Sequence, residues 1–320
     1  MLKVGLVGVG AISGAHISGW ADYNGAELVA VCDIRPEQME KVEGVNKYTS
    51  FDEMMENEEL DIVDICLPTF LHAEYAIKAM EKGKHVLCEK PLAPTAKEAQ
   101  EMFDAAKENG VYLMEAFAYQ HSPYLTAIEE EIKNGVIGDI RYMEAALITS
   151  DYVKENIRMR RDSLGGCTYD LGVYPCSLIL RMIGKEPEKV QALSSFSEEH
   201  IDLFTTVFME YEGGVKSHLN CGMVLETEKN SALNRCEIHG TKGSIKATVF
   251  GFNSPGELKY VVETFDGYKE EKTVMVPQNY RLEVEQLGRC ITSGEKPFVT
   301  ESFSVANARI IDRILETIGY

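Results

Sequence analysis

The stretch Val4-Gly5-Leu6-Val7-Gly8-Val9-Gly10-Ala11-Ile12-Ser13 begins as an apolar strand pattern and runs directly into a glycine-rich turn, after which a helical pattern starts. In a dinucleotide site the first glycine permits the tight turn, the second lets the backbone approach the pyrophosphate, and the third allows close packing of helix on strand. Here Ser13, a small residue, takes the third glycine's place. Because free amides at a helix start bind phosphates, we expect Gly8, Gly10, Ala11 and Ile12 to contact a dinucleotide.

Asp33 ends the next strand pattern, residues 28–32, where an acid that binds the ribose of the cofactor is expected. A carboxylate there accepts hydrogen bonds from the ribose hydroxyls and repels a 2′-phosphate, which favours NAD over NADP. Arg35 lies close enough in sequence to accept a 2′-phosphate instead, so NADP stays as the alternative. Asp33 also has a purely structural interpretation, as the N-cap of a helix that begins near Pro36.

The turn belongs to a longer alternation of short strands and helices. Strand patterns cover residues 3–7, 28–32, 62–66, 85–88 and 112–115, and helical patterns separate them. Two of these helices have the spacing of a capping box, Ser50 with Glu53 and Thr95 with Glu98. This alternation predicts an α/β Rossmann domain over residues 1–120, a doubly wound parallel sheet covered on both faces.

After about residue 120 the pattern changes. A helix is expected from Ser122-Pro123 to Asn134-Gly135, and helical patterns close the chain at 280–293 and 302–318. Strand-like stretches cover residues 140–149, 189–196, 204–211, 216–223, 235–239 and 244–250, the last two joined as a hairpin. We therefore expect an α+β domain over residues 121–320, built on an open, mostly antiparallel sheet.

Composition and charge exclude several classes of function. The 320 residues include 32 basic and 51 acidic side chains, for a net charge of −19. Such a chain lacks the basic footprint that nucleic acid or an anionic membrane requires. Its eight cysteines form no C-x-x-C pair and its histidines no metal-ligand spacing, so we expect no metal site and buried free thiols. With no targeting or spanning segment in view, we expect a cytoplasmic protein with a small-molecule substrate.

Three further segments raise a family resemblance: Leu67-Pro68-Thr69-Phe70-Leu71-His72, Cys88-Glu89-Lys90-Pro91-Leu92, and Gly165-Gly166-Cys167-Thr168-Tyr169-Asp170-Leu171-Gly172-Val173-Tyr174. Together with the N-terminal turn they resemble the glucose-fructose oxidoreductase and inositol dehydrogenase family (Gfo/Idh/MocA) over essentially the whole chain. The resemblance implies hydride transfer between a nicotinamide cofactor and the hydroxyl or carbonyl carbon of a sugar, cyclic polyol or vicinal diol. It also implies that residues 121–320 bind the substrate and form the contacts of an oligomer.

The resemblance assigns catalytic roles to Lys90, Tyr174 and Asp170. The lysine of the family's E-K-P segment falls on Lys90, whose ammonium would stabilise a developing alkoxide. Many relatives have histidine where this chain has Tyr174, and the tyrosine is similar to the dihydrodiol dehydrogenase-like branch. A phenol with a pKa near 10 is a poor base at neutral pH, so we expect Lys90 and Tyr174 to work as a pair. Asp170, four residues before Tyr174, would orient the substrate or the tyrosine.

Further contacts follow from the same segments. The resemblance implies that Leu67, Pro68, Thr69, His72 and Glu89 contact the cofactor, although Thr69 replaces the family's usual asparagine. Arg158 is a candidate for binding substrate hydroxyls together with Lys90, Asp170 and Tyr174. The structural alternatives are an ordinary surface lysine at Lys90, a packing aromatic at Tyr174, and a solvated run of arginines around Arg158.

Two other classes of function stay open. One is a dinucleotide-responsive binding protein without turnover, since a fold alone does not prove chemistry. The other is a glycosidase that uses tightly held NAD for transient oxidation. Whatever the function, an open antiparallel sheet with one uncovered face would be covered by a second subunit, which predicts a homodimer or homotetramer assembled through the C-terminal sheet.

Overall fold

The computed structural model describes residues 1–150, 152–225, 232–250 and 255–320. They form two compact units, Met1–His121 with Pro277–Val305, and Ser122–Val276 with Ala306–Tyr320. The expected boundary near residue 120 separates most of the chain as the structure does. The expectation placed everything beyond it in the second domain, whereas the structure groups residues 277–305 with the first unit.

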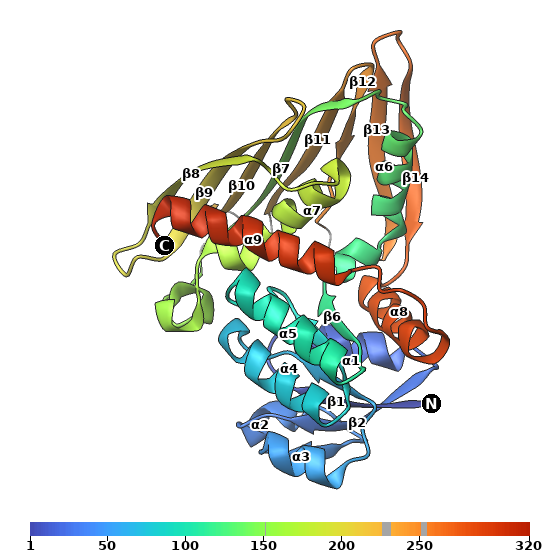
Figure 1. The fold of residues 1–320 in the computed structure, drawn as a ribbon, viewed down its shortest axis with the longest axis vertical. Coiled ribbons are helices and arrows are strands. Elements are labelled where there is room, and N and C mark those ends of the chain that lie inside the picture. Colours follow the sequence, from blue (N-terminus) through green and yellow to red (C-terminus); the bar gives the residue numbers. More distant parts are fainter. Residues whose placement is uncertain (151, 226–231, 251–254) are drawn as a thin grey trace. The chain divides into compact units, whose positions relative to one another are not determined.

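The first unit is a parallel sheet of six strands in the order β3-β2-β1-β4-β5-β6 (Figure 1). The strands are β1 (Leu2–Val7), β2 (Ala26–Cys32), β3 (Asn46–Tyr48), β4 (Ile62–Ile65), β5 (His85–Glu89) and β6 (Leu113–Ala116). The helices are α1 (Ser13–Ala21), α2 (Pro36–Met39), α3 (Phe51–Asn57), η1 (Thr69–Leu71), α4 (His72–Glu81), α5 (Ala96–Glu108), η2 (Ala118–His121) and α8 (Asn279–Ser293). The predicted doubly wound parallel sheet is confirmed.

The order of the strands places a topological switch between β1 and β4. The chain leaves β1 toward β2 and leaves β4 toward β5, in opposite directions, so right-handed crossovers put α1 and α4 on opposite faces. Helix α4 packs beside α5, and α1 packs against α8 (Figure 1). Gly19 allows this second contact, because a Cβ there would lie 3.0 Å from the backbone of Tyr280. The close packing on α1 explains why α8 belongs to the first unit.

The second unit is a sheet of eight strands in the order β14-β13-β12-β11-β7-β10-β9-β8. The strands are β7 (Ile140–Ser150), β8 (Lys189–Phe196), β9 (Asp202–Glu210), β10 (Lys216–Leu225), β11 (Ala232–Gly240), β12 (Gly243–Ala247), β13 (Gly256–Thr264) and β14 (Lys269–Val276). All neighbours run antiparallel except β10 and β7, which run parallel. The mostly antiparallel sheet and the β11–β12 hairpin are thus confirmed.

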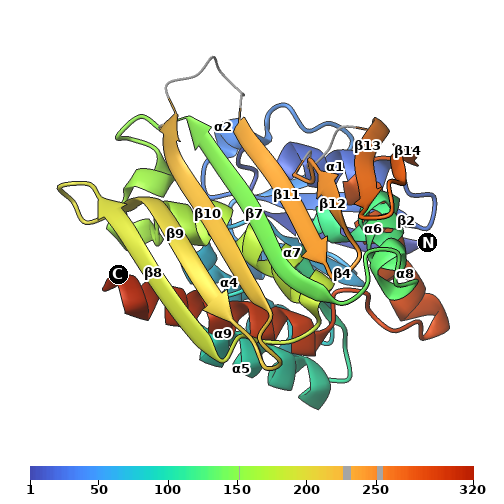
Figure 2. The same ribbon diagram turned by 90° about the horizontal axis from the view of Figure 1, so that it is seen from above.

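Helices cover one face of this second sheet. They are α6 (Pro123–Lys133), the short turns η3 (Ile157–Met159), η4 (Arg161–Ser163) and η5 (Thr168–Gly172), and α7 (Val173–Ile183). Helix α9 (Glu301–Ile318) begins in the first unit and continues in the second. Figure 2 looks onto the opposite face, where the strands from β8 to β11 lie in front of the helices. Along β9, buried residues alternate with half-buried ones such as Phe204 and Phe208, which is the pattern of a sheet with one covered face.

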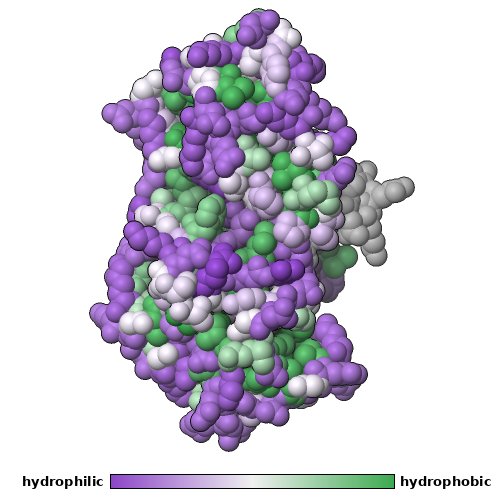
Figure 3. All heavy atoms as spheres, turned by 90° about the vertical axis from the view of Figure 1, so that its right-hand side faces the viewer, coloured by the Kyte–Doolittle hydropathy of each residue, from purple (hydrophilic) through white to green (hydrophobic). Residues whose placement is uncertain are grey.

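Two helix caps and the state of the cysteines match the predictions from the sequence. Ser50 and Thr95 both cap their helices, accepting hydrogen bonds from the backbone N–H groups of Glu53 and Glu98 at 3.4 and 3.2 Å. All eight cysteines are free and buried, as predicted. Hydrophilic residues cover most of the face drawn in Figure 3. Among the described residues, no helix is both long and apolar enough to cross a membrane.

Candidate functional site

The glycine turn after β1 has the conformation that a dinucleotide site needs. Gly8 has a φ of +91°, and a Cβ at this position would lie 2.6 Å from the carbonyl oxygen of Cys66. At Gly10 a Cβ would meet no atom within 4 Å, so the space beside this residue is open. Ser13 donates a hydrogen bond from Oγ to the carbonyl of Gly10 at 2.8 Å, which closes the turn where a third glycine is usual. The first turn of α1 has no side-chain cap, so its amides can bind an anion.

Asp33 connects this turn to the loop after β2. Its Oδ2 accepts the Val9 N–H at 2.8 Å, and its Oδ1 accepts the Arg35 N–H at 2.8 Å. The Arg35 Nε lies 3.5 Å from the same Oδ1, with the guanidinium half exposed. Helix α2 has Arg35 as its N-cap, so the alternative that Asp33 caps this helix is wrong. Each carboxylate oxygen keeps a further lone pair for a ribose hydroxyl.

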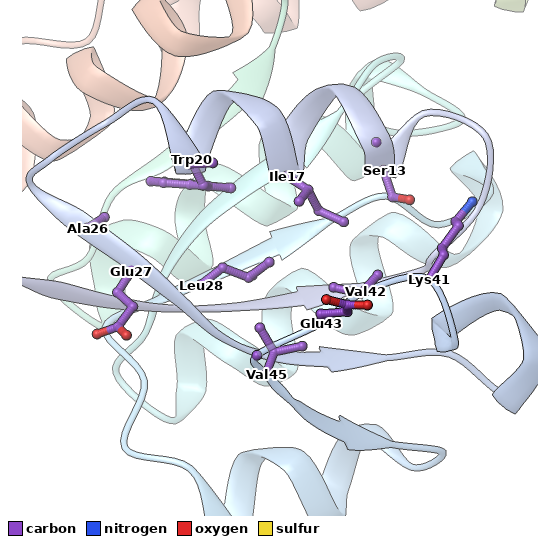
Figure 4. A pocket seen from close by; sticks show the side chains of 13 residues that line it. Ser13, Ile17, Trp20, Ala26, Glu27, Leu28, Lys41, Val42, Glu43 and Val45 are labelled. Atoms are coloured by element: carbon purple, nitrogen blue, oxygen red, sulfur yellow. The ribbon is translucent and has the colours of Figure 1, made fainter.

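A pocket of about 560 Å³ lies beside the start of α1, between this helix and residues 41–45 (Figure 4). Its floor is apolar, with Ile17, Leu28 and Val45, and Glu27, Lys41 and Glu43 stand at its exposed rim. None of the residues predicted to hold the cofactor lines this pocket. We therefore do not identify it with the dinucleotide site.

His72 joins the two loops that follow β4 and β5. Its Nε2 lies 2.7 Å from the carbonyl oxygen of Leu67, and its Nδ1 lies 2.9 Å from that of Pro91. The side chain is completely buried. The sequence predicts that His72 contacts the cofactor, and in the structure the side chain also holds the Leu67 and Pro91 segments together.

Lys90 lies at the carboxyl end of β5 and is half-buried. Its backbone N–H donates to Glu89 Oε2 at 3.0 Å, and the Lys90–Pro91 peptide bond is cis. Glu115, at the end of the neighbouring strand β6, is buried and accepts the Leu92 N–H at 2.9 Å. Burial raises the pKa of Glu115 to about 7, although the Lys90 ammonium acts in the opposite direction. The carboxyl ends of β1, β4 and β5 are where an open parallel sheet binds its ligands.

Behind Lys90, the side chain of Glu89 turns into the core and meets His16 on α1 and, beyond it, Asp64 on β4. Among the described residues, His16, Asp64 and Cys66 have donor atoms within 4.8 Å of one another, a spacing that suits a metal ion. Burial raises the pKa of the Cys66 thiol to about 12, so the thiol stays protonated. Because both nitrogens of His16 already face carboxylate oxygens, we interpret the group as a hydrogen-bonded network.

In the second unit, Gly165 and Gly166 open the segment that carries Asp170 and Tyr174. Gly166 has a φ of +110°, and a Cβ there would collide with Asp202 Oδ1. Asp202 is completely buried and accepts the Thr168 N–H at 2.8 Å and the Thr168 Oγ1–H at 2.6 Å. This carboxylate therefore fixes the start of η5, a π-helical turn of the kind that is frequent at functional sites.

An ion pair joins Arg158 to Asp170, which stands in this turn. Tyr174, four residues further on, interacts electrostatically with Arg158. Arg158 Nε lies 2.6 Å from Asp170 Oδ2, and its guanidinium stacks on the Tyr152 ring at 5.1 Å. Burial lowers the pKa of Arg158, but the charges of Asp170, Tyr152 and Tyr174 give a net increase. Tyr174 stands in the first turn of α7 and its ring meets that of Phe250 edge-on at 6.4 Å. The structure thus brings together three of the predicted substrate residues, and Arg158 is a partner of Asp170 rather than part of a solvated run.

Sequence reasoning missed the residues that support these groups. They are buried polar side chains that lie apart in the sequence: His16, Asp64, Glu115, Asp202 and Glu283. Asp64 was detectable as a charged residue inside the apolar stretch 62–65. Glu115 ends the strand pattern 112–115, Asp202 opens β9, and His16 and Glu283 stand in helices, so their roles depend on contacts that the sequence does not show.

Comparisons with known proteins bear on both units. A family model described as an oxidoreductase family with an NAD-binding Rossmann fold, GFO_IDH_MocA, matches residues 2–117. A model of the GFO/IDH/MocA C-terminal domain matches residues 125–246.

Individual relatives match over most of their length. The chain is 28% identical to a D-xylose 1-dehydrogenase (NADP(+)) of Haloferax volcanii, over 98% of this chain and 95% of that one. It is 28% identical to a trans-1,2-dihydrobenzene-1,2-diol dehydrogenase of Xenopus laevis, over 85% and 82%. Among solved structures, the 3-ketoreductase KijD10 from Actinomadura kijaniata, in complex with NADP and TDP-benzene, matches with a TM-score of 0.91 and 25% identity, over 99% and 98%. Crystal structures are also known for two KijD10 variants, one with a lysine replaced by alanine and one with a tyrosine replaced by phenylalanine.

Proposed function

The chain belongs to the Gfo/Idh/MocA family of oxidoreductases, and from this premise we propose a specific reaction. The protein transfers a hydride between the nicotinamide of NAD, with NADP as the alternative, and the hydroxyl or carbonyl carbon of a sugar, cyclic polyol or vicinal diol. The named relatives act on a sugar and on a diol, or reduce a ketone, which supports this class of substrate.

The observation that carries the proposal is the pair Lys90 and Tyr174. In KijD10 the substituted lysine and tyrosine are 84 positions apart, the same separation as between Lys90 and Tyr174 (174 − 90 = 84). Because KijD10 has the same fold, this equal separation of a lysine and a tyrosine supports the assignment of Lys90 and Tyr174 as the catalytic residues. The E-K-P and G-G-C-T-Y-D-L-G-V-Y segments support it independently.

In the first unit the glycine turn fits the phosphates of a dinucleotide, since Gly8 is the residue that the turn requires and the space beside Gly10 is open. Asp33 and Arg35 would meet the ribose, and the loops of Leu67, Pro68 and Thr69 and of Glu89 and Lys90 would line the remainder of the site. When bound, the nicotinamide supplies the acceptor or donor of the hydride.

For oxidation of an alcohol, Tyr174 Oη accepts the hydroxyl proton while the Lys90 ammonium stabilises the negative charge that develops on the oxygen. Reduction of a ketone runs in the opposite direction, with Tyr174 as the proton donor. A tyrosine base needs a cation to favour its phenolate form. Arg158 supplies one, since it interacts electrostatically with Tyr174 and is held by Asp170. We therefore add Arg158 to the proposed pair, with Asp170 orienting Arg158 as well as the substrate.

The test is a fluorescence titration with NADH and NADPH, followed by a panel of sugars and diols for cofactor reduction and of their ketones for cofactor oxidation. The proposal predicts saturable binding and turnover with at least one member of the panel. Binding without turnover would favour a dinucleotide-responsive regulator. Release of sugar without net change in the cofactor would favour the glycosidase.

We further propose that the second unit assembles a cytoplasmic homodimer or homotetramer through the uncovered face of its sheet. Phe204 and Phe208 on β9 and Leu193 on β8 supply apolar surface there, and Leu193 is 76% exposed in the single chain. The cytoplasmic location is supported separately, because the free thiols of all eight cysteines favour a reducing compartment.

The test concerns the oligomer. Light scattering of the wild type and of Phe208→Asp measures the assembly. An oligomer that this substitution dissociates supports the proposal, and a monomeric wild type contradicts it.

A further inference from the structure

His16 lies at the centre of a sealed chain of polar side chains in the first unit. Its Nδ1 lies 3.0 Å from each carboxylate oxygen of Asp64, and its Nε2 lies 2.8 Å from Oε1 of Glu89. The exposed fractions of the His16, Asp64 and Glu89 side chains are 0%, 0% and 8%. Trp20 completes the group by donating its indole N–H to Asp64 Oδ2 at 2.7 Å.

This geometry determines the protonation state of the ring. A neutral imidazole has one nitrogen that donates and one that accepts, whereas an ionised carboxylate only accepts. With an ionised carboxylate at each nitrogen both nitrogens donate, so the geometry points to an imidazolium ring. Burial lowers the pKa of His16, but the charge of Asp64 and its hydrogen bond outweigh burial and hold the pKa well above the usual value.

The other titratable groups around His16 come from the residue after β4, from α8 and from β6. Directly after β4, Cys66 stays protonated because burial raises its pKa to about 12. From α8, Tyr280 packs with its ring 5.3 Å from the His16 ring, and Glu283 is completely buried. Burial raises the pKa of Tyr280, so its phenol is neutral at pH 7, and burial holds the pKa of Glu283 well above its usual value, which favours the protonated acid. From β6, Glu115 titrates near pH 7.

We propose that His16 is a positioning residue for Lys90: as an imidazolium it holds the Glu89 carboxylate inside the core, and Glu89 holds the backbone of Lys90. The link is the hydrogen bond from the Lys90 N–H to Glu89 Oε2 at 3.0 Å, while Oε1 of the same carboxylate faces His16. This inference rests on the proposed function only in taking Lys90 as the residue that contacts the substrate.

The hydrogen-bonded side chains also connect the helix after the glycine turn with the strand that leads to Lys90. His16 stands on α1, the helix that starts at the glycine turn, and its two partners stand on β4 and β5. One cation therefore ties the phosphate-binding helix to the strand that ends at Lys90. Without it, Asp64 and Glu89 would face each other as buried carboxylates, and the structure would relax by taking up a proton or by turning Glu89 outward.

A direct test needs no substrate. In protein labelled with ¹⁵N-histidine, a long-range ¹H–¹⁵N correlation reports the protonation of each ring nitrogen, and the His16 signal is assigned with the His16→Gln variant. We expect both nitrogens of His16 to be protonated at pH 7 and above, beyond the usual pKa of a histidine. A neutral tautomer at pH 7 would overturn the proposal, whether or not turnover is found.

A second test measures the effect on Lys90. Trace acetylation with acetic anhydride, followed by mass spectrometry, gives the reactivity of the Lys90 amine against pH. In His16→Gln the Glu89 carboxylate loses its neutralising partner, so the Lys90 ammonium is held more strongly and we expect its acetylation to slow severalfold at pH 8. Glu89→Gln should move the reactivity in the opposite direction, which a general loss of structure would not do.

The kinetic test compares kcat with KM. We expect His16→Gln to lower kcat at least tenfold with KM and the cofactor Kd changed less than threefold. His85→Gln is the matched control, a histidine at the other end of β5 that accepts the Tyr112 N–H at 2.9 Å, and it should leave kcat unchanged. If His16→Gln does not fold, Glu89→Gln replaces it, with faster acetylation of Lys90 and a lower kcat as the expected results. Unchanged kcat and unchanged Lys90 reactivity in a folded variant would leave His16 with a purely structural role and contradict the proposal. A wild type without turnover would instead count against the proposed function.

Discussion

At the scale of single residues, Asp33 combines two tasks, since it holds the glycine turn through the Val9 N–H and places a negative charge beside the predicted ribose position. The charge disfavours a 2′-phosphate, whereas the exposed Arg35 guanidinium would attract one. We predict that Asp33→Asn improves the affinity for NADPH relative to NADH about tenfold, corresponding to about 1.4 kcal/mol. Fluorescence titration with both cofactors measures the ratio.

Arg35→Ala is the complementary variant in the same assay. It should weaken NADPH binding and leave NADH binding nearly unchanged. A ratio of affinities that neither substitution alters would show that these side chains do not meet the ribose.

The buried polar residues that support the site could not be predicted from the sequence. Lys90, Asp170 and Tyr174 were found because each stands in a short segment with a family resemblance. Asp202 and Glu283 stand in no such segment, and their roles depend on which backbone N–H or side chain the fold brings beside them. A contact between residues distant in sequence has no local signature, so the supporting network became visible only in three dimensions.

At the scale of elements, the glycine turn offers a matched pair of substitutions. A Cβ at Gly8 is strained at a φ of +91° and would lie 2.6 Å from a carbonyl oxygen, so Gly8→Ala should destabilise the fold by about 1–3 kcal/mol. A Cβ at Gly10 meets no atom of the chain, so Gly10→Ala should unfold at the wild-type temperature and bind the cofactor at least tenfold more weakly. Calorimetry and NADH titration separate the two effects. Wild-type affinity in Gly10→Ala would contradict a phosphate site at this turn.

The η5 turn and the start of α7 depend on Asp202, which accepts several hydrogen bonds in the core. Removing the carboxylate leaves buried donors unsatisfied, at a cost of about 1–3 kcal/mol for each. We predict that Asp202→Ala lowers both the melting temperature and kcat, because η5 carries Asp170 and leads into Tyr174. The exposed Asp266 in the same unit serves as control, and Asp266→Ala should leave kcat unchanged. Wild-type kcat in folded Asp202→Ala would show that the turn does not need this anchor.

The elements themselves were largely predictable. Apolar strands buried on both faces are easy to recognise, and β1, β2, β4, β5 and β6 all appear within a few residues of their expected places. The strands β13 and β14 were not predicted. They lie at the edge of the second sheet and carry many charged residues, as in Lys269-Glu270-Glu271-Lys272, so their hydrophobic alternation is weak. The helix α8 was predicted, but its place in the first unit depends on packing against α1.

At the scale of the whole molecule, the buried acids make stability depend on pH in a defined direction. Glu115 keeps its proton in the folded state up to about pH 7, whereas in the unfolded chain it ionises near pH 4.5. Between these values the folded state binds more protons, so the free energy of unfolding falls as the pH rises, by about 3 kcal/mol for this group. His16 and Glu283 also have raised values and act in the same direction.

Urea denaturation at pH 5 and pH 7.5 measures this effect. The wild type should be more stable at pH 5, and Glu115→Gln should lose the part of the difference that Glu115 supplies, because it has no proton to release. An equal pH dependence in the wild type and in Glu115→Gln would show that Glu115 is ionised at low pH in the folded protein.

The most direct test of the account is single-turnover hydride transfer, followed by nicotinamide absorbance in enzyme saturated with cofactor and with the best substrate of the panel. We predict that Lys90→Met and Tyr174→Phe each slow the transfer at least a hundredfold, about 2.7 kcal/mol, while the Kd of the cofactor stays within threefold of the wild type. Hydride transfer at the wild-type rate in either variant would contradict the assignment of the two residues on which the proposed reaction depends.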